Sequence, residues 1–573
     1  MIAVCKYAPL ELVASFGIPC ESRLEAPGES VDAGVIGHEN LCGFGKALLA
    51  AAMTQADGMT DEHSAKPDLV LTDCCDVTRR VFDVLAKLDG RDGTRRFLHL
   101  MGLPHSCGPC QVDMLAFELE RLCKALEEHY GKPFDLQACQ RAFREAASHT
   151  DGGEDGPYIA VLGVRASDSL VQLAASCLKM PVRDFTCMGL RSLDVDEESL
   201  LTDDRETFFR GYARALLDQV PCMRMAQTGS RRALLEDPNL AGVIYHTVSF
   251  CDFYGHEAFE LQQQHGVPVL SLETDYTVRG AGQLRTRLEA FAETMGTKMS
   301  DKESNESAQD DESRDGLLFV GIDSGSTSTD VVVIDATGDI VSQRIIPTGG
   351  SAVDTGRECL EEALADLSVP ASRVAKVVAT GYGREYLDDS DEAVTEITCH
   401  ARGARALFPG VRTIIDIGGQ DSKVITLNED GSVANFVMND KCAAGTGRFL
   451  EMMASTLQVS LEELVQAGLE WDEEIVISSM CSVFAESEVV SLKAQSKALP
   501  DIIHGLNDSI AKRTAALVKR VDGQAPFFMT GGVALNQGVV AAIEKRLGAK
   551  VAVSDDSQMA GALGAALIAC ESY

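Results

Sequence analysis

Two cysteines in the second half of the sequence stand where a thiol gains unusual chemistry. Cys442 lies in the run Asn439–Glu451 (NDKCAAGTGRFLE), where a strand-like segment enters a glycine-rich turn and then an apolar-periodic helix. A helix N-terminus carries partial positive charge and free N–H groups, so it lowers the pKa of a thiol and favours an anionic cluster. Cys481 has a similar setting, because apolar Glu474–Met480 reads as a strand that enters a helix. The two settings together predict a pair of iron–sulfur ligands.

Three glycine-containing turns in the same half of the sequence are suited to a nucleotide. Gly321–Asp330 (GIDSGSTSTD) lies between two apolar runs, which predicts a strand, a tight turn and a returning strand. A similar run, Ile415–Lys423 (IDIGGQDSK), follows, and a late Gly-Gly pair in Thr530–Asn536 comes between an apolar strand and a helix. Such turns leave N–H groups free for phosphate oxygens, and an acid at a strand end can hold hydrated magnesium. The Gly-Lys-Ser/Thr ending of a Walker loop is missing.

These turns supply the candidate residues of an ATP–Mg²⁺ site. Asp323 and Asp416 are expected to hold the magnesium shell, and Gln420 to orient the attacking water. The other candidates for cofactor binding are Ser324, Gly325, Ser326, Thr327, Gly418, Gly419, Gly445, Gly447, Gly531 and Gly532.

The three turns in this order resemble the actin, sugar-kinase and Hsp70-type ATPase superfamily, which implies a two-lobed α/β fold. With the cysteines added, residues 316–573 resemble the activators of 2-hydroxyacyl-CoA dehydratases and the ATPase subunits of benzoyl-CoA reductases. The motifs that carry the resemblance are GIDSGSTSTD, ATGYGRE, EITCHARGA, IDIGGQDSK, NDKCAAGTGRFLE, CSVFAESEV and TGGVALNQG. The resemblance implies a homodimer that shares one 4Fe–4S cluster, with Cys442 and Cys481 from each subunit. It also implies that ATP hydrolysis drives one electron to a very low potential. His400 is interpreted as a packed histidine.

The N-terminal half has its own cysteines at positions suited to a cluster. Cys42, Cys75 and Cys251 end predicted strands or lie in turns, and ligands of open α/β sheets collect at the carboxyl ends of strands. Three such thiolates can converge on one cluster, although Cys74 is a direct rival of Cys75. Two further cysteines, Cys187 and Cys222, could hold a second cubane.

The CGPC pair, Cys107 and Cys110, follows a predicted strand and precedes a helix. This is also the local setting of a thioredoxin dithiol. Cluster ligation, a redox dithiol and a plain structural role all stay open for the pair.

The N-terminal half also resembles a known group, the cluster-bearing subunits of 2-hydroxyacyl-CoA dehydratases, benzoyl-CoA reductases and double-cubane cluster proteins. The matching segments are YAPLELVASFG, NLCGFGKALL, LVLTDCCD, VRDFTCMGLR, SFCDFYGHE and VPVLSLETDYTVRGAGQLRTRLEAF. The half is shorter than expected of such subunits. One cubane or a double cubane is possible, and an additional subunit could complete the enzyme.

Composition sets the class of protein. The chain has 573 residues, a net charge of −36 and 45% hydrophobic residues. The charge argues against a nucleic-acid surface. No apolar stretch reaches the length of a membrane span, and the first residues lack the pattern of a signal peptide, so we expect a cytoplasmic protein. Eighteen cysteines in a reducing compartment indicate metal ligation or buried thiols rather than disulfides.

The acidic segment Thr297–Asp315 has almost no apolar side chain and is expected to be a flexible linker. It divides the chain into residues 1–150 and 151–296, two α/β lobes with parallel sheets, and the ATPase at 316–573. Short apolar runs that alternate with amphipathic helices predict the parallel sheets.

The working hypothesis is a fused electron pump and acceptor of anaerobic metabolism. A ferredoxin or flavodoxin would load the Cys442/Cys481 cluster, and ATP hydrolysis would pass the electron to a cluster of the N-terminal half. That half would activate a 2-hydroxyacyl-CoA for dehydration or reduce a small molecule. Two alternatives stay open, a small-molecule kinase of the same superfamily and a regulatory or assembly ATPase that binds clusters without turnover.

Overall fold

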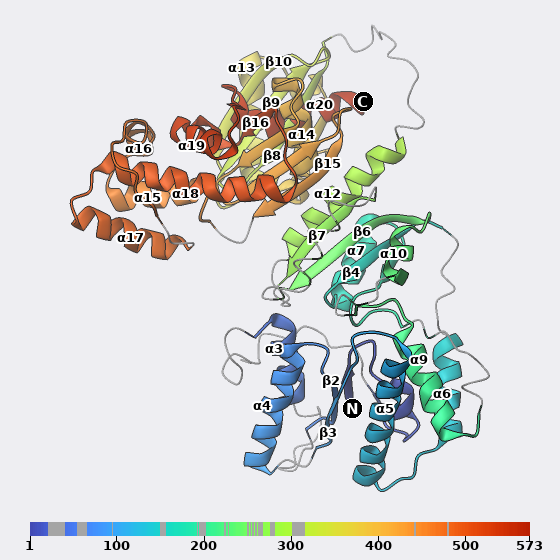
Figure 1. The fold of residues 1–573 in the computed structure, drawn as a ribbon. Coiled ribbons are helices and arrows are strands. Elements are labelled where there is room, and N and C mark those ends of the chain that lie inside the picture. Colours follow the sequence, from blue (N-terminus) through green and yellow to red (C-terminus); the bar gives the residue numbers. More distant parts are fainter. Residues whose placement is uncertain are drawn as a thin grey trace. The chain divides into compact units, whose positions relative to one another are not determined.

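The computed structural model divides the chain into two compact units, an N-terminal unit (Met1–Leu288) and a C-terminal unit (Glu289–Tyr573) (Figure 1). The residues that the structure describes are 1–20, 41–53, 66–93, 96–148, 156–191, 193, 202–222, 225–226, 229–248, 251, 254, 257, 261, 267–274, 281–300, 316–439, 443–477 and 481–573. Cys442 lies outside the described residues, as do residues 301–315 of the expected linker.

The N-terminal unit contains two parallel sheets, as the alternation of strands and helices predicts. One has the order β1-β2-β3 and the other the order β5-β4-β6-β7, with parallel pairing throughout. The strands are β1 (Ile2–Val4), β2 (Leu69–Thr72), β3 (Leu98–Met101), β4 (Tyr158–Gly163), β5 (Val182–Asp184), β6 (Leu240–Val248) and β7 (Val269–Thr274). The helices are α1 (Leu10–Ala14), α3 (Gly43–Met53), α4 (Asp76–Asp92), α5 (Pro109–Tyr130), α6 (Leu136–Ser148), α7 (Asp168–Leu178), α9 (Arg205–Leu217) and α10 (Gly229–Leu235). A further helix, α12 (Ala281–Ser300), begins in this unit and ends in the C-terminal unit.

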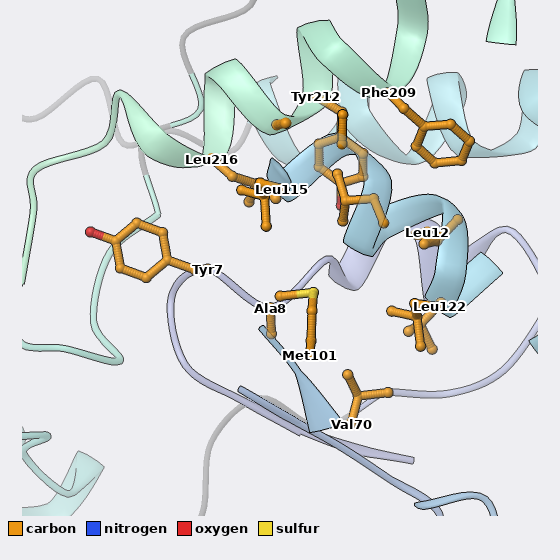
Figure 2. Packing of buried hydrophobic residues seen from close by; sticks show 14 of the residues in the cluster. Tyr7, Ala8, Leu12, Val70, Met101, Leu115, Leu122, Phe209, Tyr212 and Leu216 are labelled. Atoms are coloured by element: carbon orange, nitrogen blue, oxygen red, sulfur yellow. The ribbon is translucent and has the colours of Figure 1, made fainter. Parts of the chain in front are cut away.

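The core of the first sheet draws on a helix from far along the chain. Figure 2 shows Leu115 and Leu122 of α5 with Phe209 and Tyr212 of α9 around the segment that follows β1. Tyr212 is fully buried, and its hydroxyl donates a hydrogen bond to Glu11. Residues near 210 are therefore part of the same core as the first fifteen residues.

The C-terminal unit repeats one sheet topology. Its two five-stranded sheets have the orders β10-β9-β8-β11-β12 and β15-β14-β13-β16-β17, in which two antiparallel pairs lead into parallel ones. This duplicated arrangement is the actin-like ATPase fold. The strands are β8 (Leu318–Ser324), β9 (Ser328–Asp335), β10 (Ile340–Pro347), β11 (Val374–Thr380), β12 (Glu392–Ala393), β13 (Thr413–Ile417), β14 (Ser422–Leu427), β15 (Val433–Asn439), β16 (Phe527–Thr530) and β17 (Val551–Ala552).

Helices pack on these sheets, and several of them contribute residues to the candidate site described below. They are α13 (Ala352–Leu367), α14 (Glu396–Leu407), α15 (Gly447–Leu457), α16 (Leu461–Ala467), α17 (Ser482–Ala494), α18 (Leu499–Arg520), α19 (Gln537–Leu547) and α20 (Ala560–Glu571). Among the described residues, no helix is both long enough and apolar enough to cross a bilayer.

One predicted strand is wrong. The described part of Glu474–Met480 is not a strand, although Ile475 and Ile477 are buried and Val476 is 70% exposed. The alternation arises because Ile475 packs on α18, where a Cβ on Gly505 would lie 2.6 Å from the Ile475 carbonyl oxygen. An extended segment that packs on a helix gives the same period of two as a strand in a sheet.

Helices α14 and α20 approach so closely that glycine is required at their contact. A Cβ on Gly403 would lie 1.8 Å from the carbonyl oxygen of Ala560. We expect Gly403→Ala to destabilise the C-terminal unit by about 1–3 kcal/mol, because the helices must separate. The chain has a single tryptophan, Trp471, so its fluorescence during urea unfolding reports this unit. Gly350→Ala is the control, since nothing lies within 4 Å of that Cβ, and an equal loss in both variants would contradict the prediction.

Candidate functional site

A cavity of about 420 Å³ lies between the two sheets of the C-terminal unit. The turn after β8, the turn after β13 and the Gly-Gly turn after β16 all line it, so the three predicted glycine turns meet at one place. The predicted site residues that line it are Asp323, Gly325, Ser326, Thr327, Asp416, Gly418, Gly419, Gly447, Gly531 and Gly532.

Three other predicted residues lie elsewhere. Ser324 is buried behind the first turn, where a Cβ on Gly383 would lie 2.2 Å from its Oγ. Gln420 is exposed, and neither it nor Gly445 is part of the cavity lining. The orientation of a water by Gln420 stays a prediction.

The turn at Gly531 needs glycine for two reasons. Its φ is +83°, and a Cβ would lie 2.4 Å from the Ile417 carbonyl oxygen and 2.9 Å from Oδ1 of Asp416. Any side chain here would therefore push the turn away from the acid that the site needs.

A buried lysine holds the acids of the cavity together. The Lys423 ammonium lies 2.8 Å from Asp421, 3.2 Å from Asp416 and 3.5 Å from Glu396. Burial alone would lower the pKa of Lys423, but these carboxylates outweigh burial and raise it well above that of a free lysine. Tyr382 donates its hydroxyl hydrogen to Asp421 at 3.1 Å.

The two acid-bearing hairpins differ at the position across the strand from the acid. In the second hairpin Lys423 pairs with Asp416, whereas in the first Asp330 pairs with Asp323. Burial, and then the charge of Asp323, raises the pKa of Asp330 to about 8. One hairpin thus carries a cation opposite its acid, and the other carries a second acid.

Asp330, Glu396 and Lys423 line the cavity but were not among the residues predicted for the site. The cross-strand register could have found Asp330 and Lys423, because each follows its hairpin acid at the same spacing along the chain. Glu396 opens α14 and its Oε1 has no hydrogen-bond partner among the described residues. Burial raises the pKa of Glu396 despite Lys423 beside it.

His400 is buried, as its interpretation as a packed histidine requires, and it also lines the cavity. Its Nδ1 lies 3.3 Å from the Thr530 hydroxyl and 3.6 Å from Asp416. His400, Lys423 and the Thr530 hydroxyl together lower the pKa of Asp416, although burial alone would raise it. These three groups therefore favour the ionised form of Asp416 in spite of its burial.

A second cavity, of about 190 Å³, lies in the N-terminal unit and is lined mainly by sulfur-containing and apolar side chains, with Asp76, Thr78 and Tyr254. All five cysteines predicted as metal ligands in this half line it together with two more. The seven are Cys5, Cys42, Cys74, Cys75, Cys187, Cys222 and Cys251. They come from positions along almost the whole unit, so the fold itself brings them together.

Strand ends explain most of this convergence. Cys5 follows β1, Cys74 and Cys75 follow β2, and Cys251 follows β6. The rule that selected Cys75 and Cys251 applies equally to Cys5, which the sequence analysis missed because β1 has only three residues. Cys5 has a φ of +114°, a strained conformation that a non-glycine residue keeps mainly at functional sites.

Burial and neighbouring thiols raise the pKa values of four of these seven cysteines. Contact with the Cys5 thiol, and then burial, raises the pKa of Cys74, although the Cys75 thiol beside it acts in the opposite direction. Contact with the Cys74 thiol, and then burial, raises the pKa of Cys75. Burial also raises the pKa values of Cys42 and Cys187. A metal bound by these cysteines would have to replace their protons, because thiolates rather than thiols are the metal ligands.

The donor set fits an iron–sulfur cluster. Soft thiolates select such clusters, and Cys42 and Cys75 directly precede α3 and α4, whose N-termini favour negative charge. In the described part of the chain, no three His, Cys, Asp or Glu side chains are gathered closely enough for a single metal ion. Cys107 and Cys110 are not part of the cavity lining, and Cys110 is exposed at the start of α5.

Cys481 lies on an apolar surface. It is exposed at the N-cap of α17, next to Val483 and Phe484, which are 63% and 69% exposed. Helix α17 contacts α15, the helix that follows Cys442, and Thr456 donates a hydrogen bond to Glu486 at 3.1 Å. Large exposed apolar side chains in one place are typical of an interaction surface.

Comparison with known proteins gives a match for each half. Residues 5–152 and 144–295 match the family described as 2-hydroxyglutaryl-CoA dehydratase, D-component, and residues 320–569 match the BadF/BadG/BcrA/BcrD ATPase family. Both resemblances expected from the motifs are confirmed.

Individual relatives align with the C-terminal half. The chain is 44% identical over 253 residues to a 2-hydroxyisocaproyl-CoA dehydratase activator from Clostridioides difficile, covering 44% of this chain and 95% of that protein. It is 43% identical over 254 residues to the (R)-2-hydroxyglutaryl-CoA dehydratase activating ATPase from Acidaminococcus fermentans, covering 44% of this chain and 97% of that one. A solved structure of the activator of the 2-hydroxyisocaproyl-CoA dehydratase from Clostridium difficile with bound ADPNP matches with 43% identity and a TM-score of 0.43. That match covers 45% of this chain and 95% of the other.

The raised pKa of Asp330 predicts how stability changes with pH. Its folded-state pKa of about 8 lies above the ordinary 3.8, so the unfolded chain releases this proton at lower pH than the folded one. Stability is therefore lost as pH rises from about 4 to about 8. We expect Asp330→Asn, without nucleotide, to flatten this loss, measured as the urea midpoint of Trp471 fluorescence at pH 5 and pH 8. Asp388→Asn, at an exposed position, should keep the wild-type slope, and an unchanged slope in Asp330→Asn would contradict the assignment.

Proposed function

The chain belongs to two families, the 2-hydroxyglutaryl-CoA dehydratase D-component family in its first half and the BadF/BadG/BcrA/BcrD ATPase family in its second, and from this pairing we propose that it is an ATP-driven electron pump fused to its own acceptor. ATP hydrolysis in the C-terminal unit would drive one electron at very low potential to an iron–sulfur site of the N-terminal unit. The observation that carries the proposal is the cavity lined by seven cysteines, on the same chain as an ATPase cleft.

The ATPase cleft supplies groups for binding and hydrolysis. The backbone N–H groups of Gly325–Thr327 and of Gly418–Gly419 would hold phosphate oxygens, and Asp323 with Asp416 would hold the magnesium shell. The first hairpin carries two acids and no cation, so we place the metal nearer to Asp323 and Asp330. Lys423 fixes the second acid, Asp416, at its position.

Cysteines of both units would bind the iron–sulfur clusters. Cys442 and Cys481 are our candidates for a 4Fe–4S cluster that two copies of the chain share, and the exposed apolar side chains around Cys481 are suited to such a homodimer. Cys42, Cys75, Cys251, Cys187 and Cys222, with Cys5 and Cys74 added, are the candidates in the N-terminal unit. Bound clusters would supply one-electron storage at potentials set by their surroundings.

The apolar wall of the N-terminal cavity would exclude water from the reacting site. Val4, Val164 and Val248 line it, and Tyr254 presents a buried hydroxyl that has no hydrogen-bond partner among the described residues. Such a hydroxyl could donate to an acceptor molecule, either an acyl-CoA thioester or a small molecule. The donor would be a ferredoxin or flavodoxin of a reducing cytoplasm.

Iron content tests the cluster assignments. We expect oxygen-free purification to give brown protein, and Cys442→Ser or Cys481→Ser to lose about two iron atoms per chain, half of one shared cubane. Both variants should also shift from dimer to monomer in light scattering. Cys177→Ser, on α7 and away from the cavity lining, is the control with unchanged iron. If Cys442→Ser kept its iron, that residue would not be a ligand.

ATP-dependent reduction tests the pump itself. With a reduced ferredoxin as donor, ATP should reduce the N-terminal cluster of the wild type, seen by electron paramagnetic resonance. Asp416→Asn should lower both hydrolysis and reduction by about a hundredfold or more, because the metal shell loses a charge. Colourless protein with a phosphorylated product would instead indicate a small-molecule kinase. Brown protein without ATP-dependent reduction would indicate a regulatory or assembly ATPase.

A further inference from the structure

Part of helix α12 matches the family of the N-terminal half in sequence but belongs to the C-terminal unit in structure. The dehydratase D-component match runs to residue 295, yet the C-terminal unit begins at Glu289, inside α12. The ATPase match does not begin until residue 320. The stretch 289–295 is therefore outside the ATPase family match and still packs with the ATPase fold.

Glu293 of this stretch caps α14. Its Oε1 accepts a hydrogen bond from the Thr395 N–H at 3.0 Å, and its Oε2 accepts from the Thr395 and Thr398 hydroxyls, the latter at 2.5 Å. Thr395 is the N-cap residue of α14 but makes no cap hydrogen bond with its own side chain. A carboxylate at this end also suits the helix dipole. Glu293 therefore provides the cap that α14 lacks.

Glu289, one helical turn earlier, holds a second element of the cleft. It forms an ion pair with Arg384 at 2.5 Å, and the Arg384 side chain is only 5% exposed. Arg384 also donates to the Gly381 carbonyl at 3.1 Å, and Gly383 donates its N–H to the Ser324 carbonyl at 3.0 Å. The turn held by Glu289 thus lies directly against the first phosphate hairpin.

Both elements carry side chains of the cleft on their other side. Glu396, next to Thr395, and His400, one turn further along α14, line the cleft. Tyr382 lies in the turn that Arg384 closes and also lines the cleft. Ala290 of α12 is fully buried in one cluster with Ile397 of α14, so apolar packing accompanies the hydrogen bonds of Glu293 and the ion pair of Glu289.

We propose that nucleotide binding in the cleft is coupled to the packing of α12, the helix through which the chain enters the C-terminal unit. Glu293 and Glu289 are the positioning residues of this coupling. Nucleotide in the cleft would restrict the motion of Glu396, His400 and Tyr382. It would thereby stabilise the contacts that α14 and the 381–384 turn make with α12. The coupling free energy is reciprocal, so the contacts that Glu293 and Glu289 of α12 make also raise the affinity for nucleotide. The proposal rests on the proposed function only in requiring that the cleft bind nucleotide.

The test uses the full chain with Mg·ADP and with a non-hydrolysable ATP analogue. Calorimetry should show about a five- to tenfold loss of affinity in Glu293→Gln, in which an amide N–H₂ meets the donors of Thr395 and Thr398. In the wild type, nucleotide should slow amide hydrogen exchange of α12 over residues 289–296. Glu293→Gln should abolish that protection, a response that a merely structural residue would not give.

Matched variants make the result decisive. Glu358→Gln, the same change at an exposed position of α13, should match the wild type in both readouts. Thr398→Val keeps the carboxylate and removes one donor, so it should show a smaller loss of affinity even if Glu293→Gln folds poorly. Wild-type affinity together with wild-type protection in both Glu293→Gln and Thr398→Val would overturn the inference. A wild type that bound no nucleotide would overturn the proposed function and this inference together.

Discussion

The C-terminal unit depends on one buried ammonium group. Lys423 faces three carboxylates, Asp416, Asp421 and Glu396, and all four of these side chains are buried. A buried carboxylate costs several kcal/mol unless a partner offsets the loss of hydration, so three of them could not be held together without this cation. The hairpin supplies it by register alone, since Lys423 lies directly across from Asp416. The position of the acid and of its counter-ion are thus fixed by the same pair of strands.

The duplicated fold uses that register in two ways. Where the second hairpin has Lys423, the first has Asp330, and burial, followed by the charge of Asp323 across the strand, raises the pKa of Asp330. The same backbone therefore makes one half internally neutralised and leaves the other ready for an external cation. In the proposed function, an ATP-bound Mg²⁺ would supply a cation to that half. The two halves of the repeated fold thus differ in charge at one paired position, which is Lys423 in the second hairpin and Asp330 in the first.

Much of the fold and of the candidate site could be predicted from short sequence patterns. The remaining features depend on which segments of the chain pack against one another. The glycine turns, the parallel sheets and the strand-end cysteines follow from short patterns, and the structure has each turn and sheet where they were expected. Lys423 and Asp330 were missed because their role comes from the strand opposite. The wrong strand at Glu474–Met480 has the same origin, since alternation reports which side is buried and not what buries it. Glu293 could not be found from sequence at all, because its partner Thr395 lies about a hundred residues along the chain.

Family boundaries and cooperative boundaries need not coincide in a fused chain. The ATPase match begins at residue 320, but the cap of α14 and the counter-ion of Arg384 both come from α12. A C-terminal unit cut at the family boundary would keep every glycine turn and leave a buried guanidinium and a helix N-terminus without their acids. Such groups are costly when unpaired. The last turns of the dehydratase-like sequence are therefore part of the ATPase fold, and a segment that joins the two units is a structural part of the C-terminal one.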